Sequence, residues 1–254
     1  MTESSLTTLI DIGNEIQGED EEKWKDFVDC ENGFFYGIPY CAPRAVKLNP
    51  PHKSLTEIGP DLGKGGCKWL CGVRANNGKI YCAPFNANQH ILNINTNDGT
   101  VKTLDNVELP ERGKYMWQQS GALASDNRIY YVPSNARRIM RLNPDNDTLS
   151  IVGGDLGGGW WKYGGTVVGN DDCVHGIPLL TTRIVKFDPT NPGTTSFIGE
   201  DAEENFECDK GVLAGDGYIY AANYAGQVLQ IDTNNCNYIW IGDRIYSLGT
   251  GYHE

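Results

Sequence analysis

Four tryptophans recur along the chain at nearly constant intervals of 45, 48 and 44 residues, and three of them have a lysine beside them. Aromatic faces with neighbouring cations and amides suit sugars or anionic small molecules, so these residues could form a ring of ligand contacts. The alternative is packing, because a tryptophan buries roughly 150–250 Å² and a residue repeated in every unit is what packing between units requires. The candidate binding set is Trp24, Trp69, Trp117, Trp161, Lys68, Lys162, Asn86 and Asn135.

Catalytic residues are less evident. Among the four histidines only His175 occupies a repeated position, where it replaces a tyrosine, and the chain has neither a metal-binding histidine pair nor a nucleophile motif. Asp26 and Asp209 could face each other as an acid/base pair if the first and last repeats are neighbours. We expect no metal ion and no cofactor, and favour a non-catalytic role over an enzymatic one. Polar residues that break the repeat and would line a central channel are Asp26, Arg74, Gln119, Lys162 and Asp209.

These residues belong to a unit that recurs five times at intervals of 45 to 49 residues. Each copy has four short segments of alternating polarity, such as Ile184–Asp188, that end in turn-forming Asn, Asp or Gly. No helical periodicity is sustained, and four strands at this period are typical of β-propeller blades. The expected repeats are 23–66, 67–113, 114–159, 160–206 and 207–254.

The sequence thus predicts an all-β protein, a single β-propeller domain over 1–254 with five four-stranded blades. Residues 5–22 would add one outer strand and a loop, because Leu6–Gly13 has the pattern of a fourth strand. Six or more blades, or part of a longer array, is the alternative. The loops from fourth to first strands and from second to third strands should share one face, which is the expected binding face.

The repeats resemble those of the short-repeat β-propeller superfamily, in particular the streptogramin B lyase-like and NHL-like repeats. Segments such as Asn77–Tyr81 and Arg183–Pro189 carry this resemblance, which extends over nearly the whole chain. For the lyases it implies seven blades and a catalytic histidine with a metal ion. Since five repeats are present and only His175 stands at a repeated position, the resemblance implies the fold and transfers no catalytic residue.

The chain is acidic, with a net charge of −12 and a pI near 4.8. This balance argues against nucleic acid or anionic membranes as general partners, since both require basic surfaces. The sequence contains no run of 18 apolar residues, so we expect no membrane insertion. The N-terminus lacks the pattern of a signal peptide, which favours the cytoplasm. The acidic runs 19–22 and 200–204 are expected to be solvated loops that could contact a basic partner.

Eight cysteines show no zinc-binding spacing, which favours free and mostly buried thiols in a reducing compartment. Cross-strand disulfides in a secreted protein, Cys30 with Cys41 or Cys71 with Cys82, are the alternative. Taken together, the sequence favours a binding or assembly module that recognises a partner protein or a carbohydrate through one face of the propeller. A propeller hydrolase or lyase with polar residues in the channel is the alternative.

Overall fold

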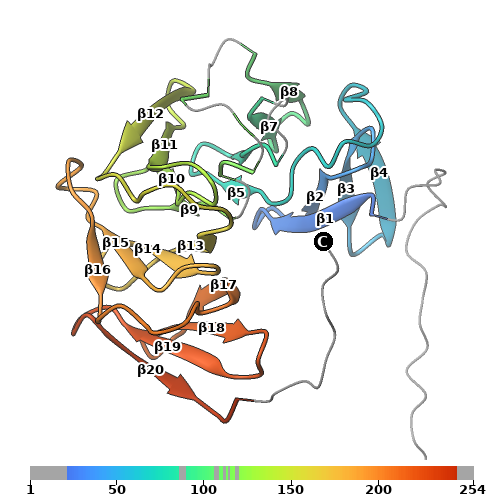
Figure 1. Ribbon diagram of the computed structural model, residues 1–254. Coiled ribbons are helices and arrows are strands. Elements are labelled where there is room, and N and C mark those ends of the chain that lie inside the picture. Colours follow the sequence, from blue (N-terminus) through green and yellow to red (C-terminus); the bar gives the residue numbers. More distant parts are fainter. Residues whose placement is uncertain are drawn as a thin grey trace, which may run out of the picture.

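Five antiparallel four-stranded sheets follow one another around a common axis in the computed structural model, as Figure 1 shows. The structure describes residues 22–85, 90–105, 109–110, 113, 115–117 and 120–244. Every sheet has its strands in chain order and lies within one of the repeats expected from sequence. The prediction of an all-β propeller with five four-stranded blades is therefore confirmed. The extra strand expected at Leu6–Gly13 lies outside the described residues.

The first three blades contain strands β1 to β12. Blade 1 comprises β1 (Trp24–Asp29), β2 (Phe35–Pro39), β3 (Ala45–Asn49) and β4 (Ser54–Ile58). Blade 2 comprises β5 (Val73–Arg74), β6 (Lys79–Cys82), β7 (Leu92–Asn95) and β8 (Val101–Thr103). Blade 3 comprises β9 (Ala122–Leu123), β10 (Ile129–Tyr131), β11 (Ile139–Asn143) and β12 (Thr148–Val152).

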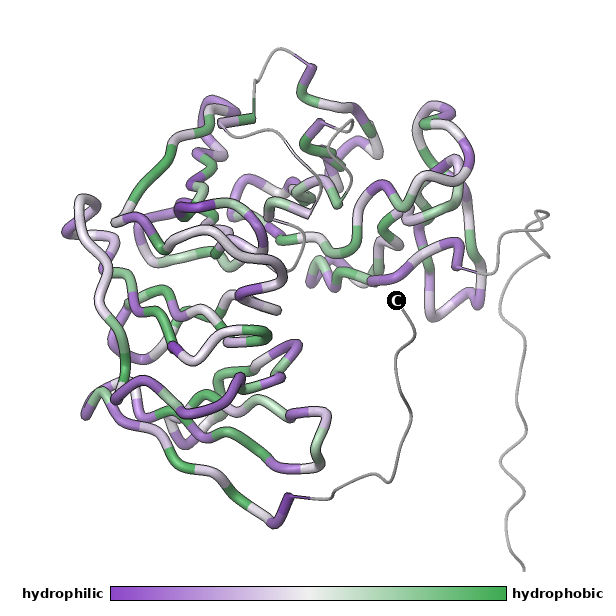
Figure 2. Tube along the Cα trace, viewed as in Figure 1, coloured by the Kyte–Doolittle hydropathy of each residue, from purple (hydrophilic) through white to green (hydrophobic). Residues whose placement is uncertain are grey.

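The last two blades contain strands β13 to β20. Blade 4 comprises β13 (Tyr163–Val168), β14 (Val174–Pro178), β15 (Ile184–Phe187) and β16 (Ser196–Ile198). Blade 5 comprises β17 (Cys208–Leu213), β18 (Ile219–Asn223), β19 (Val228–Asp232) and β20 (Asn237–Ile241). Figure 2 shows short hydrophobic and hydrophilic stretches alternating along the chain of each blade, as expected for strands whose successive side chains point to opposite faces.

Side chains of the turn residues hold the hairpins closed. The Asn77 side-chain oxygen accepts a hydrogen bond from the Lys79 amide at 3.0 Å, and Gly78 between them has a φ of +77°. The same contact between residues two apart recurs at Asp98, whose carboxylate accepts from the Thr100 amide at 2.9 Å. These short polar side chains replace a backbone partner in the turn, which is why the repeats end in Asn and Asp.

Each blade has two apolar faces. We call the face that packs against the preceding blade the incoming face, and the face that packs against the following blade the outgoing face. A tyrosine of the second strand marks the outgoing face: the Tyr36 hydroxyl donates to the Thr96 carbonyl of blade 2 at 3.3 Å. Tyr81 likewise donates to the Pro144 carbonyl of blade 3 at 3.2 Å, and Tyr130 packs on Phe187 of blade 4. These contacts lock successive blades together.

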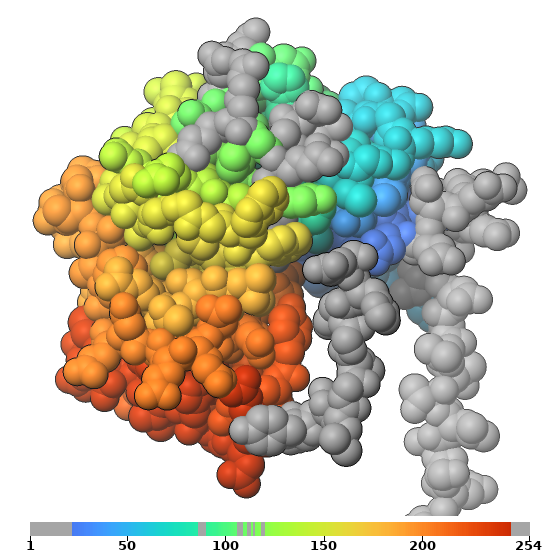
Figure 3. Space-filling model, viewed as in Figure 1, coloured from blue at the N-terminus to red at the C-terminus, as the bar shows by residue number. Residues whose placement is uncertain are grey.

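Four hydrophobic clusters of described residues hold the blades together, one at each junction from blade 1 to blade 5. None of these clusters joins blade 5 to blade 1. Figure 1 shows a gap between the ribbons of β17–β20 and those of β1–β4, and Figure 3 shows the surface of the described residues interrupted at the same place. Within the described residues, the blades form an open arc.

All eight cysteines are free, and five of them are buried: Cys30, Cys71, Cys82, Cys173 and Cys208. The alternative of disulfides between Cys30 and Cys41 or between Cys71 and Cys82 is therefore not realised. The described part of the chain contains no helix that could cross a lipid bilayer.

Candidate functional site

Three of the four repeated tryptophans make the same contact with the protein. Their indole N–H groups donate to a backbone carbonyl 20 or 21 residues further on: Trp24 to Arg44 at 2.9 Å, Trp69 to His90 at 2.7 Å, and Trp117 to Arg138 at 2.9 Å. Trp69 and Trp117 are at most 1% exposed, whereas Trp24 is half-buried. These contacts are those expected of the packing interpretation, and a ligand role for the three rings stays a prediction.

In blade 4 a tyrosine occupies the position that tryptophan has in blades 1 and 2. Trp24 pairs with Pro39 and Trp69 with Pro84, and the residue that pairs with Pro178 is Tyr163. Trp161 lies two residues earlier with a φ of +55°, and its ring lies 5.3 Å from that of Tyr115. Asn135 holds this segment in place, because its side-chain oxygen accepts a hydrogen bond from the Trp161 amide at 2.8 Å.

The two lysines of the candidate set are buried and bind loop carbonyls. The Lys68 ammonium donates to the carbonyls of Gly63 and Gly65 at 3.0 and 3.3 Å, and Lys162 donates to that of Ala136 at 2.7 Å. Each lysine directly precedes the residue that pairs with the proline, so the two are equivalent in the fold. They satisfy carbonyl groups of the connecting loops. Asn86, the last member of the set, lies outside the described residues.

Polar side chains from blades 1, 2 and 5 meet near the axis of the arc. The Asp26 carboxylate accepts a hydrogen bond from the Gly72 amide at 3.1 Å. The Lys210 ammonium lies within hydrogen-bonding reach of the Cys71 thiol and interacts with the charges of Asp26 and Asp209. Burial raises the pKa of Cys71 to about 11, so this thiol stays protonated at neutral pH. Burial also raises the pKa of Asp209.

The two aspartates that sequence reasoning singled out are thus both close to a lysine that it did not select. Lys210 directly follows Asp209, and its place in the fifth copy of the repeat was the available signal. Arg74 is bound elsewhere, since its guanidinium forms an ion pair with Glu31 at 2.7 Å. The remaining channel candidate, Gln119, lies outside the described residues.

His175 belongs to the junction between blades 4 and 5. Its imidazole is fully buried and lies 3.0 Å from Asp171, whose carboxylate also forms an ion pair with Lys186 at 2.6 Å. Lys186 in turn donates to the Thr233 carbonyl of blade 5 at 3.2 Å. Burial by itself would raise the pKa of Asp171, but the hydrogen bonds from His175 and Lys186 outweigh it and hold that pKa well below its usual range.

A metal site would require several ligating side chains in one place. No group of three or more His, Cys, Asp or Glu side chains converges in this way within the part of the chain that the structure describes. The buried His175 group is accordingly a polar contact between blades.

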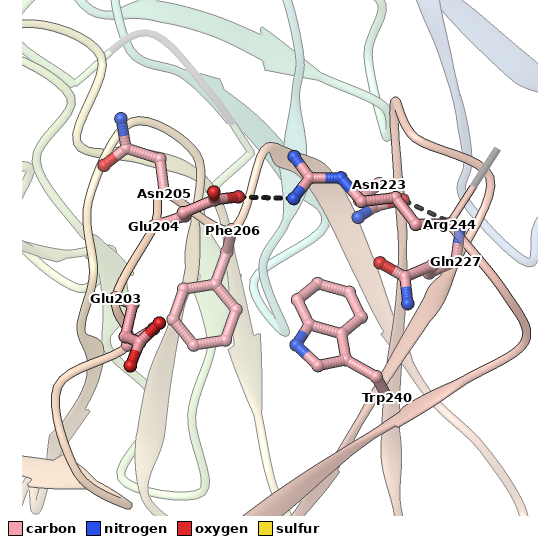
Figure 4. Close-up of a pocket in the computed structure, with 9 residues that line it drawn as sticks. Glu203, Glu204, Asn205, Phe206, Asn223, Gln227, Trp240 and Arg244 are labelled. Carbon is pink, nitrogen blue, oxygen red and sulfur yellow. Dashed lines mark hydrogen bonds and ion pairs between the residues drawn. The ribbon is translucent and has the colours of Figure 1, made fainter. Parts of the chain in front are cut away.

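A cleft opens at the edge of blade 5, beside the loop from β16 to β17 and the turn from β18 to β19 (Figure 4). It has a volume of about 230 Å³ and continues into a shallower hollow beside Glu207 and Thr182. The first connection joins a fourth strand to a first strand, and the second joins a second strand to a third. Both are of the kinds expected on the binding face. The cleft is lined by Ala202, Glu203, Glu204, Asn205, Phe206, Asn223, Gln227, Trp240 and Arg244.

Two aromatic rings form the floor of the cleft. The rings of Phe206 and Trp240 lie 5.6 Å apart at an angle of 31°, and Figure 4 shows them side by side between the two connections. Phe206 is fully buried, so Trp240, which is half-buried, supplies the accessible aromatic surface. Sequence reasoning did not select Trp240, because this residue stands on a fourth strand and not at the repeated tryptophan position.

The rim of the cleft is mainly acidic. Glu203 and Glu204 are exposed on one side, and Arg244 reaches across to form an ion pair with Glu204 (Figure 4). Arg244 also lies 4.0 Å from Glu207. Together with Glu207 of the adjoining hollow, the rim has three carboxylates and one guanidinium, so this region carries a net negative charge. The acidic run at 200–204 was the sequence signal for this loop.

The turn from β18 to β19 supplies the opposite side. The Asn223 side-chain oxygen accepts a hydrogen bond from the Gln227 amide at 2.8 Å, and the Gln227 side chain donates to the Gly242 carbonyl at 3.2 Å. These bonds tie the turn to the end of β20. The cleft therefore combines an aromatic floor, an acidic rim and a wall with amide side chains.

Comparison with known proteins identifies the fold. No protein-family model matches the chain, and no curated protein matches its sequence. Among solved structures, the virginiamycin B lyase from Staphylococcus aureus superposes with a TM-score of 0.70 at 14% identity, over 88% of this chain and 71% of the lyase. A streptogramin B lyase superposes with a TM-score of 0.68 at 16% identity, over 87% of this chain and 68% of the lyase.

A third similar structure is that of a binding protein. An auxiliary nutrient-binding protein from Bacteroides ovatus superposes with a TM-score of 0.61 at 10% identity, over 89% of this chain and 59% of that protein. The likeness to the lyases confirms the expected streptogramin B lyase-like propeller fold. Because enzymes and a binding protein share this fold, it does not decide between the two functions.

Proposed function

We propose that this chain is a non-catalytic binding module that holds a basic segment of a partner protein in the cleft of blade 5. The observation that carries the proposal is the acidic rim, formed by Glu203, Glu204 and Glu207, around the accessible ring of Trp240. A lysine or arginine side chain fits this arrangement, since carboxylates bind its charge and an aromatic face attracts cations. The connections that form the cleft belong to the loop classes that sequence reasoning assigned to the binding face.

The overall charge supports the same class of partner. A protein with a net charge of −12 attracts basic surfaces over distances of about 10 Å at moderate ionic strength. Because Glu203 and Glu204 are exposed, each ion pair with the partner contributes only about 0.2–1 kcal/mol. We therefore expect modest, salt-sensitive affinity for a single segment.

The test is fluorescence anisotropy with a labelled octapeptide of alternating lysine and arginine, and with a glycine-serine octapeptide as the neutral control. Glu203→Gln should weaken binding of the basic peptide about two- to fivefold, corresponding to the loss of one exposed ion pair. Trp240→Phe should weaken it further by reducing the aromatic surface. The matched control is Glu57→Gln, because Glu57 is also exposed but lies on β4 of blade 1.

Equal affinities for the Glu203→Gln and Glu57→Gln variants would contradict the proposal. The proposal would also be contradicted if binding of the basic peptide did not change between 50 and 300 mM NaCl, where the Debye length falls from about 14 Å to about 6 Å. A neutral oligosaccharide that binds in a Trp240-dependent manner, when the basic peptide does not, would instead establish the carbohydrate alternative.

An acid/base enzyme is the second candidate, and the polar group at the axis supports it. Asp26 comes from the first repeat and Asp209 and Lys210 from the fifth, and these residues break the symmetry of the arc, as a catalytic group would. Chromogenic esters and glycosides supply the assay. Activity that is lost in both Asp26→Asn and Asp209→Asn, with the fold retained, would establish this candidate in place of the binding module.

A further inference from the structure

The outgoing face of blade 5 has the residues of a junction between blades, but none of the blades that the structure describes packs against it. In blade 4 the corresponding face is covered by blade 5, and Val167 and Ile198 are 8% and 1% exposed. Their equivalents by strand register, Val212 and Ile241, are 63% and 44% exposed. The neighbouring Ile239 is also more than half exposed. Large apolar groups gathered on one face indicate an interaction surface.

Tyr220 shows the same absence of a following blade. Its counterparts Tyr36, Tyr81 and Tyr130 are fully buried at the next junction, whereas Tyr220 is only partly buried. The Tyr220 hydroxyl lies 2.8 Å from Asp216 and accepts a hydrogen bond from Gln230 at 2.6 Å, both within blade 5. The Tyr220 hydroxyl is thus held by an aspartate four residues earlier, as that of Tyr130 is held by Asp126 at 2.8 Å, but the Tyr220 ring is less buried.

The incoming face of blade 1 is the second uncovered wall. In blade 2 the corresponding positions Ile80 and Ile94 are fully buried against blade 1. Their equivalents in blade 1, Phe35 and Leu48, are only half-buried, and Phe27 on the first strand is 42% exposed. Both walls of the gap therefore have the apolar pattern that the chain uses wherever two blades pack together.

The gap is shaped as a wedge. At the axis the walls converge, because Lys210 of β17 interacts with Asp26 of β1 and reaches the Cys71 thiol. Toward the outside the ribbons of β20 and β4 lie far apart, as Figure 1 shows. Since blades are arranged around an axis, the space that one blade occupies between its two neighbours has the same wedge shape. The same fold in the virginiamycin B lyase extends beyond the part matched by this chain, which is 71% of that protein.

We propose that the outgoing face of blade 5 is a docking surface for a further four-stranded blade of the same repeat type, presented by a partner polypeptide. The partner's matching surface is an incoming face such as that of blade 4, where Val174, Val185 and Phe187 pack against blade 3. The docked blade would cover Val212, Ile239 and Ile241 on one side and approach Phe27 on the other. The cleft beside Trp240 lies on the incoming side of the blade 5 sheet and is separate from this surface.

The test appends a blade of known sequence to the full chain. A second copy of residues 160–206 is fused after residue 254, so that its incoming face can reach blade 5. The fusion should raise the Tm by about 4 °C or more, since each kcal/mol of stabilisation shifts the Tm of a chain of this size by about 2–4 °C. Amide hydrogen exchange in β18 and β19 should slow in the fusion.

The matched control is Val212→Asp in both the fused and the unfused chain. In the unfused chain this exposed substitution should move the Tm by no more than about 2 °C. In the fused chain it should abolish the gain, because a buried unpaired carboxylate opposes docking. A fusion with an unchanged Tm and an appended copy that trypsin removes as an unfolded tail would overturn the proposal.

The size of the unfused chain in solution distinguishes the remaining possibility. Sedimentation velocity between about 1 and 100 µM should show a monomer, since the proposed partner is a different polypeptide. A concentration-dependent dimer that Val212→Asp dissociates would overturn the proposal and identify a second copy of this chain as the occupant.

Discussion

One pair of substitutions tests whether blade 5 is the uncovered end of the arc. Ile198 on β16 and Ile241 on β20 occupy equivalent positions, each followed by glycine and each on an outgoing face. Ile198 is 1% exposed within the cluster that joins blades 4 and 5, and Ile241 is 44% exposed. We compare Ile198→Ala with Ile241→Ala, so that the lost side chain and the strand context are the same.

The magnitudes follow from burial. Ile198→Ala leaves a cavity in a packed junction and should cost about 2–5 kcal/mol of unfolding free energy. Ile241→Ala shortens a side chain that is already 44% exposed and leaves no enclosed cavity, so its cost should be below about 1 kcal/mol, the range of strand propensity. The lower strand propensity of alanine reduces the unfolding free energy of both variants alike, so this contribution cancels in the comparison. The expected difference of about 2–4 kcal/mol corresponds to roughly 4–16 °C in Tm.

Urea unfolding of the purified chain, followed by both circular dichroism and tryptophan fluorescence, measures the difference. Coincident curves from the two probes are needed before free energies are compared. Equal destabilisation by the two substitutions would refute the reasoning, because Ile241 would then have to be as well packed in solution as Ile198. A small cost for both would refute the assigned packing between blades 4 and 5.

Three further predictions concern single contacts. Trp69→Ala should destabilise the chain by about 3–5 kcal/mol in urea unfolding, because its ring is fully buried, and a neutral result would revive a ligand role for the tryptophan ring. Tyr81→Phe should cost about 1–2 kcal/mol through its lost bonds to blade 3, while Tyr220→Phe should cost less than half as much; equal costs would contradict the assigned junctions. Lys186→Met should lower stability by about 1–3 kcal/mol at pH 7. The lowered pKa of Asp171 stabilises the fold fully above the unfolded value of about 3.9, and this contribution declines as the pH falls below that value toward the lowered folded pKa. The loss should therefore shrink as the pH falls below about 4, and a constant loss down to pH 2 would argue against this ion pair.

Local patterns in the sequence were sufficient to predict the blades. Alternating polarity sets which face of each strand is apolar, and short polar residues such as Asn77 and Asp98 place the turns, so both features can be read within one repeat. The recurrence of a tyrosine on the second strand predicted equivalent blades in the same way. The five four-stranded sheets therefore required no information from distant residues.

The candidate site was predicted only in part. The loop classes to which the acidic run at 200–204 and the turn at 223–226 belong were placed on the expected binding face, but nothing in either segment indicates that Trp240 and Arg244 lie between them. Trp240 is on the last strand, more than 30 residues from Glu204, and the two meet only because blades 4 and 5 pack together. A contact of this kind depends on the angle between blades, which no repeat encodes by itself.

The tertiary structure also decided how deeply repeated residues are buried. Repetition alone is the same for a tryptophan that packs and one that binds a ligand, and the burial of Trp69 and Trp117 follows only once neighbouring blades are in place. Likewise Val212 and Val167 are equivalent in sequence, and only the three-dimensional arrangement shows one exposed and the other covered. The physical reason is that local sequence sets the shape of a blade, whereas closure of the arc depends on how many blades pack and at what angle.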